Sequence, residues 1–304
     1  MSHSSTKGIL SSLLSSHLPN RKDNLNQIII KLVFVITLLT MIVSFVSVSF
    51  HFLQIKSETD IIKNNYELLG KDEPLTRQQI NAFLNINTDF RGYIKIGDTT
   101  VNNPVFQAKN NTFYANHNQI KEKSIFGSLY FDCDNKITFK ETDKNLVIYG
   151  NKTENGQLFS ALESYKNINF YKENPTVNLS TFYSKDTYAI YSVFLINSKA
   201  EDDGGYIYNY KQKEFVDASE FDNWVFEAKQ RSIINTNVTA EFKDTILTLV
   251  TDSEEFEGAK LVVMAQKVEK DETLNTSEVT ISKSPRYPQI WYKNKGIDFP
   301  FENN

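Results

Sequence analysis

The chain has few of the side chains on which most catalytic and metal sites depend. Its 304 residues include one cysteine and four histidines. The single cysteine, Cys133, excludes an intrachain disulfide and therefore a disulfide-stapled secreted scaffold. Only His117 falls outside the first long apolar run and the residues before it, so an imidazole base has one candidate. No cysteine and histidine cluster has metal-ligand spacing, and we expect no metal and no cofactor.

A strong charge of either sign is also missing. The formal net charge is −4, and lysines and acids are interspersed along the chain. Bulk charge therefore gives no reason to expect a nucleic-acid partner, and the mixed charges predict an ordinary solvated surface.

One long apolar run is present at Leu32–Leu53, which contains no Lys, Arg, Asp or Glu. As a helix rising about 1.5 Å per residue it spans about 33 Å, close to the roughly 30 Å of a hydrocarbon core. The rival interpretation is a cleaved signal peptide, whose apolar region is shorter, about 7–15 residues, and precedes a small-residue cleavage site. We favour an uncleaved membrane anchor. The flanking charges are Lys7, Arg21, Lys22, Lys31 and one acid, Asp23. This excess of positive charge predicts a single-pass protein of the cell membrane with a cytoplasmic N-terminus and an extracellular remainder.

The rest of the chain divides by composition and periodicity. Residues 1–31 form a cytoplasmic tail and 32–53 the transmembrane anchor, and 54–88 are expected to form a helical extension. Within that extension Pro74–Thr76 and the following RQQINAFLNI predict a helix start. Residues 89–268 are expected to form the main domain. The periodicity is lost in 269–304, a C-terminal extension for which both partial disorder and packing on the domain remain open.

From Gly92 the pattern changes to short runs rich in β-branched and aromatic residues, of which 176–182 and 187–197 alternate apolar and polar residues. The predicted strands are 93–96, 101–107, 128–132, 145–149, 176–182, 187–197, 245–251 and 260–268. Two helical segments interrupt them, at 156–165 and 215–231. Seven or eight short strands with helical insertions predict a mainly β, α+β fold, a small closed β-barrel rather than a layered α/β sheet.

Five segments resemble motifs of the class B sortase family, in the order and spacing of that family. They are FRGYIKIGDTTVNNPVFQ, FYANHNQIKEKSIFGSLYFD, LVIYGNKTENGQLF, the helical insertion at 215–231, and the hairpin ILTLVTDSEEFEGAKLVVMA at Ile246–Ala265. The resemblance covers about residues 80–268 and implies a sortase-type barrel. It also implies a membrane-bound cysteine transpeptidase outside a Gram-positive cell. Such an enzyme cleaves a sorting signal through an acyl-enzyme and transfers the product to an amine of the cell wall.

The residues that the family uses for this chemistry are replaced. The histidine position is Asn151, the cysteine position of the TLxTC motif is Asp252, and the arginine position is Lys260. An amide cannot exchange a proton near neutral pH, and Lys260 lacks the two-pronged guanidinium. A carboxylate is also a poor nucleophile toward an amide, because it is the better leaving group. By analogy with the family, the candidates for the substrate groove are Asn116, Tyr149, Val250 and Thr251.

Three other side chains are candidates to replace the missing catalytic groups. Cys133 is interpreted as a partly buried strand residue, and His117 as a structural residue, since the family also has that histidine beside the catalytic one. Ser253 would need a base, for which Asp252 is the nearest candidate.

The sequence therefore supports three hypotheses. The favoured one is a catalytically inactive sortase-like protein whose groove binds a sorting-signal peptide or another sortase. The alternative is an active sortase B-type transpeptidase that attaches surface proteins to peptidoglycan with unconventional catalytic residues. The third is a vestigial protein with no ligand. In all three, Asp252 and Lys260 are expected side by side on adjacent strands, where the pair would keep the charge balance of the groove.

Overall fold

The computed structural model describes residues 17–69, 75–269 and 274–301. The chain divides into two compact units, Met1–Ser57 and Glu58–Asn304. Helix α2 (Leu25–Leu69) begins in the first unit and contains the predicted anchor. It continues without a break past Leu53, where we had placed the end of the anchor. The helix is long and apolar enough to cross a membrane. A signal sequence near the N-terminus meets the same criteria of length and composition.

Helix α3 (Arg77–Ile86) begins where the sequence predicts it. The Thr76 side chain accepts a hydrogen bond from the Gln79 backbone N–H, and the Gln79 side chain accepts one from the Thr76 backbone N–H at 2.7 Å. This reciprocal capping satisfies two N–H groups that have no partner inside the helix. Phe83 is buried on the apolar face and stacks on Phe90 of the barrel.

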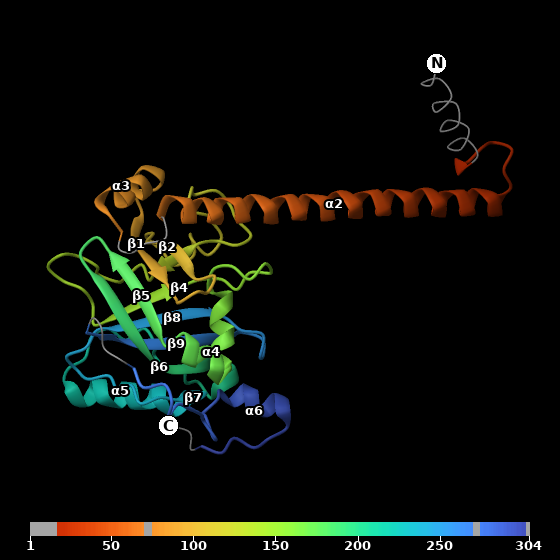
Figure 1. Cartoon of the computed structure of the whole chain (residues 1–304). Helices are drawn as coiled ribbons and strands as arrows, with labels where there is room; N and C mark the ends of the chain where they lie inside the picture. The colour runs from red at the N-terminus through yellow and green to blue at the C-terminus, as the bar shows by residue number, and fades with distance from the viewer. Residues whose placement is uncertain (1–16, 70–74, 270–273, 302–304) are drawn as a thin grey trace. The chain divides into compact units, whose positions relative to one another are not determined.

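The second unit is built on a closed barrel of eight strands, which confirms the predicted fold (Figure 1). The strands are β1 (Phe90–Lys95), β2 (Asn102–Phe106), β3 (Leu129–Phe131), β4 (Asn145–Tyr149), β5 (Thr176–Thr181), β6 (Lys185–Asn197), β8 (Ile246–Asp252) and β9 (Ala259–Val268). Their order around the barrel is β1-β2-β3-β4-β8-β9-β6-β5, and the pairing of β1 with β5 closes it. Closure leaves the barrel without an exposed edge strand.

Short helices fill the connections between strands. Helix α5 (Ala218–Arg231) lies within the predicted insertion and begins after the capping side chain of Asp217. It packs on β6 through the Ser192 hydroxyl, which donates to the Ala228 carbonyl at 2.7 Å. The predicted helix at 156–165 is a 3₁₀ helix, η1 (Phe159–Lys166), and is followed by α4 (Ile168–Glu173). A second 3₁₀ turn, η2 (Ala200–Asp203), precedes α5.

The described part of the C-terminal extension packs on other elements of the second unit. Strand β10 (Thr280–Ile281) pairs with β7 (Ile234–Asn235) in a separate two-stranded sheet. Helix α6 (Gln289–Lys295) starts where the Gln289 backbone N–H donates to the Asp203 carboxylate of η2. Tyr292 is buried, and its hydroxyl donates to the Pro285 carbonyl at 3.1 Å. Of the two outcomes that the sequence left open, residues 274–301 show packing, while 270–273 and 302–304 lie outside the described residues.

Candidate functional site

Two adjacent parallel strands bring the family-equivalent positions to one end of the barrel. Strand β4 runs parallel to β8 with Tyr149 opposite Val250. The pairing continues beyond the strand, since the Gly150 backbone N–H donates to the Val250 carbonyl at 3.1 Å. Asn151 and Asp252 therefore follow the same register at the carboxyl ends of neighbouring strands. The topology brings together two residues that lie far apart in the chain.

Asp252 and Lys260 face each other across the β8–β9 hairpin. They are paired in the antiparallel register, and Lys260 Nζ lies 2.7 Å from Asp252 Oδ1. The predicted side-by-side placement is confirmed. The Asp252 side chain is 61% exposed and that of Lys260 is 34% exposed. The site therefore has a solvated carboxylate whose near neighbour is an ammonium, and the ammonium donates one of its hydrogen bonds to that carboxylate.

Asn151 is held by the backbone of the loop opposite it. Its Nδ2 donates to the Ala115 carbonyl at 2.8 Å and to the Phe126 carbonyl at 3.0 Å. Both N–H groups of the amide are therefore used. A neutral imidazole has one N–H, so a histidine could not satisfy both carbonyls at once. The amide ties two ends of the 115–126 loop together, which is a structural role for this position.

The β8–β9 loop is acidic, and each of its three carboxylates pairs with a different lysine. In addition to the Asp252 pair, Glu254 lies 2.9 Å from Lys152, Glu255 lies 2.8 Å from Lys166, and Glu257 lies 2.6 Å from Lys199. The three partner lysines come from the segment after β4, from η1 and from the segment after β6. The loop is thus attached to three other parts of the second unit.

Lys166 is the most buried of these partners. Its ammonium also lies 2.6 Å from Glu163 and donates to the Ser253 hydroxyl at 3.3 Å. Burial lowers the pKa of Lys166, but the hydrogen bonds and charges of Glu163 and Glu255 outweigh it and hold the pKa above its ordinary value. Lys166 is therefore a charged junction between η1 and the loop that follows Asp252.

The four groove candidates differ in how far they reach the surface. Asn116 is exposed and Tyr149 is half-buried. Val250 and Thr251 are each 2% exposed, so their side chains offer little area to a ligand. The Thr251 hydroxyl is buried and has no hydrogen-bond partner among the described residues. The part these four residues play in binding stays a prediction.

Tyr149, a groove candidate, belongs to an aromatic and acidic cluster whose other members, Tyr130 and Asp132, the sequence does not single out. Tyr130 and Tyr149 have ring centroids 5.3 Å apart, and the Tyr149 hydroxyl donates to Asp132 Oδ2 at 2.8 Å. Burial raises the pKa of Tyr130, and the charge of Asp252 raises it further. Burial, Tyr210 and Asp132 likewise raise the pKa of Tyr149. Both phenols therefore stay neutral and can donate hydrogen bonds.

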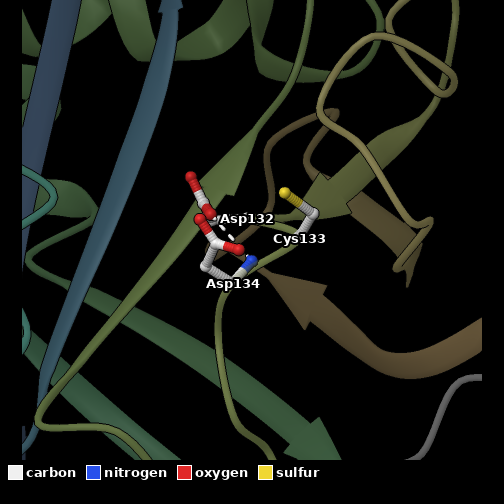
Figure 2. Close-up of side chains that lie close together, drawn as sticks. All are labelled: Asp132, Cys133 and Asp134. Carbon is white, nitrogen blue, oxygen red and sulfur yellow. Dashed lines mark hydrogen bonds between the residues drawn. The ribbon is translucent and has the colours of Figure 1, made fainter.

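Cys133 lies in the turn after β3 rather than in the strand where the sequence placed it (Figure 2). Its thiol and the carboxylates of Asp132 and Asp134 have ligand atoms within 4.8 Å of one another. Asp132 is already engaged, because it accepts hydrogen bonds from Tyr149, from Asn111 Nδ2 and from the Asp134 backbone N–H. Burial and the two carboxylates raise the pKa of the Cys133 thiol, which disfavours the nucleophilic thiolate.

His117 has a structural environment. Its ring stacks on Phe113 with centroids 4.1 Å apart, and Nδ1 donates to the Phe113 carbonyl at 2.8 Å. These contacts hold one face and one ring nitrogen of the imidazole within its own loop, as the sequence interpretation expects.

Comparisons with known proteins agree with this architecture, although no family model matches the chain. The chain is 28% identical over 204 residues to sortase B of Staphylococcus aureus, covering 67% of this chain and 80% of that protein. It is 29% identical over 196 residues to sortase B of Listeria monocytogenes, covering 64% and 76%.

Solved structures give the same answer. An X-ray structure of a mutant form of Clostridium perfringens sortase B superposes with a TM-score of 0.59 and 31% identity, covering 68% of this chain and 97% of that chain. A Staphylococcus aureus sortase B–substrate complex gives a TM-score of 0.61 and 26% identity, covering 72% and 98%. The eight-stranded barrel with its helical insertion is thus a sortase fold. Within that class, the chain belongs to the class B sortase family.

Several residues of the site could not be found from the resemblance. Lys152, Lys166 and Lys199 had one sequence signal, the acidic composition of the 252–257 loop, which calls for cationic partners. Lys211 and Tyr210 lie in the connection before α5 and had no such signal.

Proposed function

We propose that this protein is a membrane-anchored, extracellular pseudo-sortase of class B that binds a peptide or a partner protein without processing it. The observation that carries the proposal is the 2.7 Å ion pair of Asp252 with Lys260 at the positions of the nucleophile and the arginine. The thiolate that the family reaction requires is replaced by a carboxylate, and the cation that would steady an oxyanion is bound to that carboxylate.

The position of the general acid supports the same proposal. Both N–H groups of Asn151 are bound to backbone carbonyls, and an amide has no proton to exchange near neutral pH. The reaction that the family resemblance implies has therefore lost its nucleophile, its acid and its guanidinium. The barrel around these positions remains intact.

A binding role is supported by what the relatives bind. Sortase B of Staphylococcus aureus has been solved as a complex with substrate. A barrel that keeps the fold and loses the chemistry can still present the same end of β4 and β8 to a peptide. The membrane anchor in α2 would place this surface outside the cell, beside the wall.

Isothermal titration of the full chain in detergent micelles tests the binding role. The first probe is a sorting-signal peptide, and its control is the same peptide with a scrambled sequence. We expect saturable binding of the first and none of the second. Asn116→Ala should weaken binding about fivefold by removing an exposed polar contact. Asn169→Ala, an exposed asparagine on α4, should leave it unchanged.

Equal heats for the two peptides, or none for either, would favour a protein without a ligand in its groove. Saturable binding accompanied by release of a cleaved product would instead favour the alternative of an active transpeptidase with unconventional residues.

A further inference from the structure

The ammonium of Lys211 lies above an aromatic surface next to the hairpin. Lys211 Nζ is 5.4 Å from the ring centroid of Tyr149 and 5.8 Å from that of Tyr210. It is also 3.8 Å from Asp132 Oδ2. An ammonium within about 6 Å of a tyrosine face is attracted by the negative face of the ring. Two rings and a carboxylate therefore surround one cationic group.

The carboxylate of this cluster is positioned from several sides. Asp132 has a side chain 9% exposed, and its Oδ2 accepts from the Tyr149 hydroxyl at 2.8 Å and from Asn111 Nδ2 at 3.0 Å. Tyr130, which is buried, packs beside Tyr149 with ring centroids 5.3 Å apart. The Asp132 carboxylate makes this a site for a cation, because it would repel an anion.

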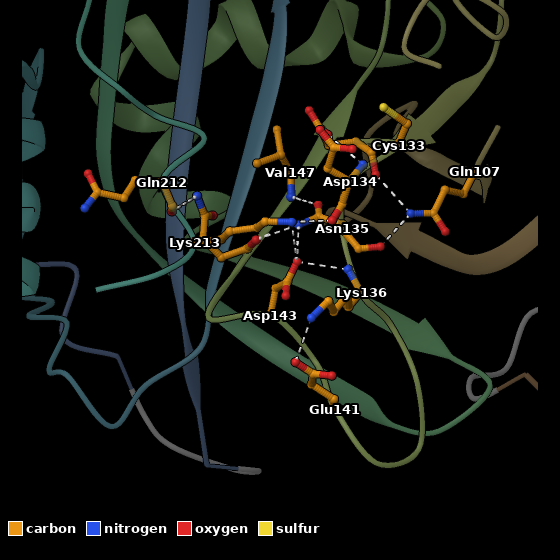
Figure 3. A network of polar contacts seen from close by, with 12 residues as sticks. Gln107, Cys133, Asp134, Asn135, Lys136, Glu141, Asp143, Val147, Gln212 and Lys213 are labelled. Atoms are coloured by element: carbon orange, nitrogen blue, oxygen red, sulfur yellow. Dashed lines mark hydrogen bonds and ion pairs between the residues drawn. The ribbon is translucent and has the colours of Figure 1, made fainter. Parts of the chain in front are cut away.

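The backbone that carries Lys211 is fixed on both sides. Asn145 Nδ2 donates to the Tyr210 carbonyl at 2.8 Å and to the Gln212 carbonyl at 3.0 Å. Lys213 Nζ lies 3.2 Å from Asp143 Oδ2, in the polar network of Figure 3. The Lys211 side chain itself is 48% exposed. It can therefore swing into solvent while the loop stays in place.

We propose that Tyr130, Tyr149, Tyr210 and Asp132 form a binding site for an alkylammonium group, such as the lysine side chain of a peptide partner. Lys211 occupies this site in the structure and is displaced by the ligand. The displaced Lys211 loses its contacts with Asp132 and the two rings, so the incoming ammonium must replace these contacts and also offset the entropy of association. The inference deepens the proposed function, on which it rests for the groove being a binding surface, and names a cationic residue in the ligand.

The test uses a probe with one ammonium. Nα-acetyl-lysine amide is titrated into the full chain in detergent micelles, and the control is the same molecule with its side-chain amine acetylated. Lys211→Met keeps the length and apolar stem of the side chain but removes the competing charge. We expect this variant to bind the lysine probe about tenfold tighter than the parent chain, and to discriminate against the acetylated probe. Adding Tyr149→Leu to it should reverse the gain.

A matched control separates the site from a general effect of charge. Lys144 lies 4.9 Å over the ring of Phe242, outside the cluster, and Lys144→Met should leave the affinity for the probe unchanged. Each variant is compared with the parent by near-ultraviolet circular dichroism and by its unfolding midpoint. Equal affinity of Lys211→Met and the parent chain would overturn the proposal, as would equal affinity for the two probes.

The lysine-probe titration and the peptide titration can fail separately. Loss of the lysine-probe effect with intact binding of the sorting-signal peptide would overturn only the ammonium site. Loss of peptide binding with an intact lysine-probe effect would overturn the sorting-signal part of the proposed function.

Discussion

Lys260 Nζ lies 2.7 Å from Asp252 Oδ1, across a hairpin in which the two residues are directly paired. In the class B sortase family, to which the chain belongs, the resemblance assigns these positions to the nucleophilic cysteine and the arginine. Here the ammonium and the carboxylate neutralise each other. Their charges are therefore explained by the ion pair, without a reacting group.

The first prediction concerns the strength of this pair. Because the Asp252 side chain is 61% exposed, water screens the attraction, and the coupling free energy should be about 0–1 kcal/mol. A double-mutant cycle of Asp252→Asn and Lys260→Met, followed by urea unfolding of the full chain in micelles, measures it. A coupling above about 2 kcal/mol would mean that the pair is shielded from solvent, contrary to the structure.

Asn151 leads to a second prediction. Asn151→Ala leaves the Ala115 and Phe126 carbonyls without their amide donor, which should lower the free energy of unfolding by about 1–3 kcal/mol. Asn155→Ala is the matched control. Its Nδ2 donates to the Thr59 hydroxyl, a contact between side chains, and we expect a loss of about 1 kcal/mol or less. If the two variants were equally stable, the proposed structural role of Asn151 would be wrong.

The loop after Asp252 provides a third prediction. Lys166→Met removes a junction with Glu163, Glu255 and Ser253, so backbone amides of 253–258 should exchange with solvent roughly three- to tenfold faster. Lys199→Met is the control, because the Glu257 side chain that pairs with Lys199 is 90% exposed. This variant should change the exchange rates little. Hydrogen exchange read by mass spectrometry checks both. Similar exchange in the two variants would show that Lys166 does not hold the loop.

The barrel and much of the hairpin geometry could be predicted, because they depend on local patterns. Short runs rich in β-branched and aromatic residues located all eight barrel strands, and β4 was predicted with its observed bounds. The hairpin register placed Asp252 opposite Lys260 because an antiparallel pair has regular spacing. The short elements α4, α6, β7 and β10 were missed, since they are too brief to show a period.

The contacts that complete the site could not be predicted for a different reason. Lys211 reaches Tyr149 and Asp132 through the fold of a long connection, with no fixed separation in the sequence. The carbonyls that hold Asn151 belong to the backbone, whose position no side-chain pattern reveals. The sequence divides the apolar run, which ends at Leu53, from an expected helical extension, and the structure joins the two in one helix, α2. The polar residues that follow are good helix formers, so α2 continues to Leu69 although the hydropathy changes.

A fourth prediction concerns the membrane topology. If α2 crosses the membrane with its N-terminus inside, Val216→Cys, which replaces a side chain 91% exposed, should react with a membrane-impermeant maleimide on intact cells. Lys22→Cys should react only after the cells are opened. Both are made in a Cys133→Ser background, so that the added thiol is the single cysteine of the chain. Labelling of Lys22→Cys on intact cells would contradict the proposed orientation.

The proposed loss of the catalytic function is tested most directly by turnover. The full chain in micelles is incubated with a fluorogenic sorting-signal peptide and an amine acceptor, beside the triple variant Asn151→His, Asp252→Cys and Lys260→Arg. We predict no cleavage by the natural chain. The triple variant should show cleavage that a thiol reagent abolishes, because the barrel already holds the three positions together. Turnover by the natural chain that disappears in Asp252→Ala would contradict the account.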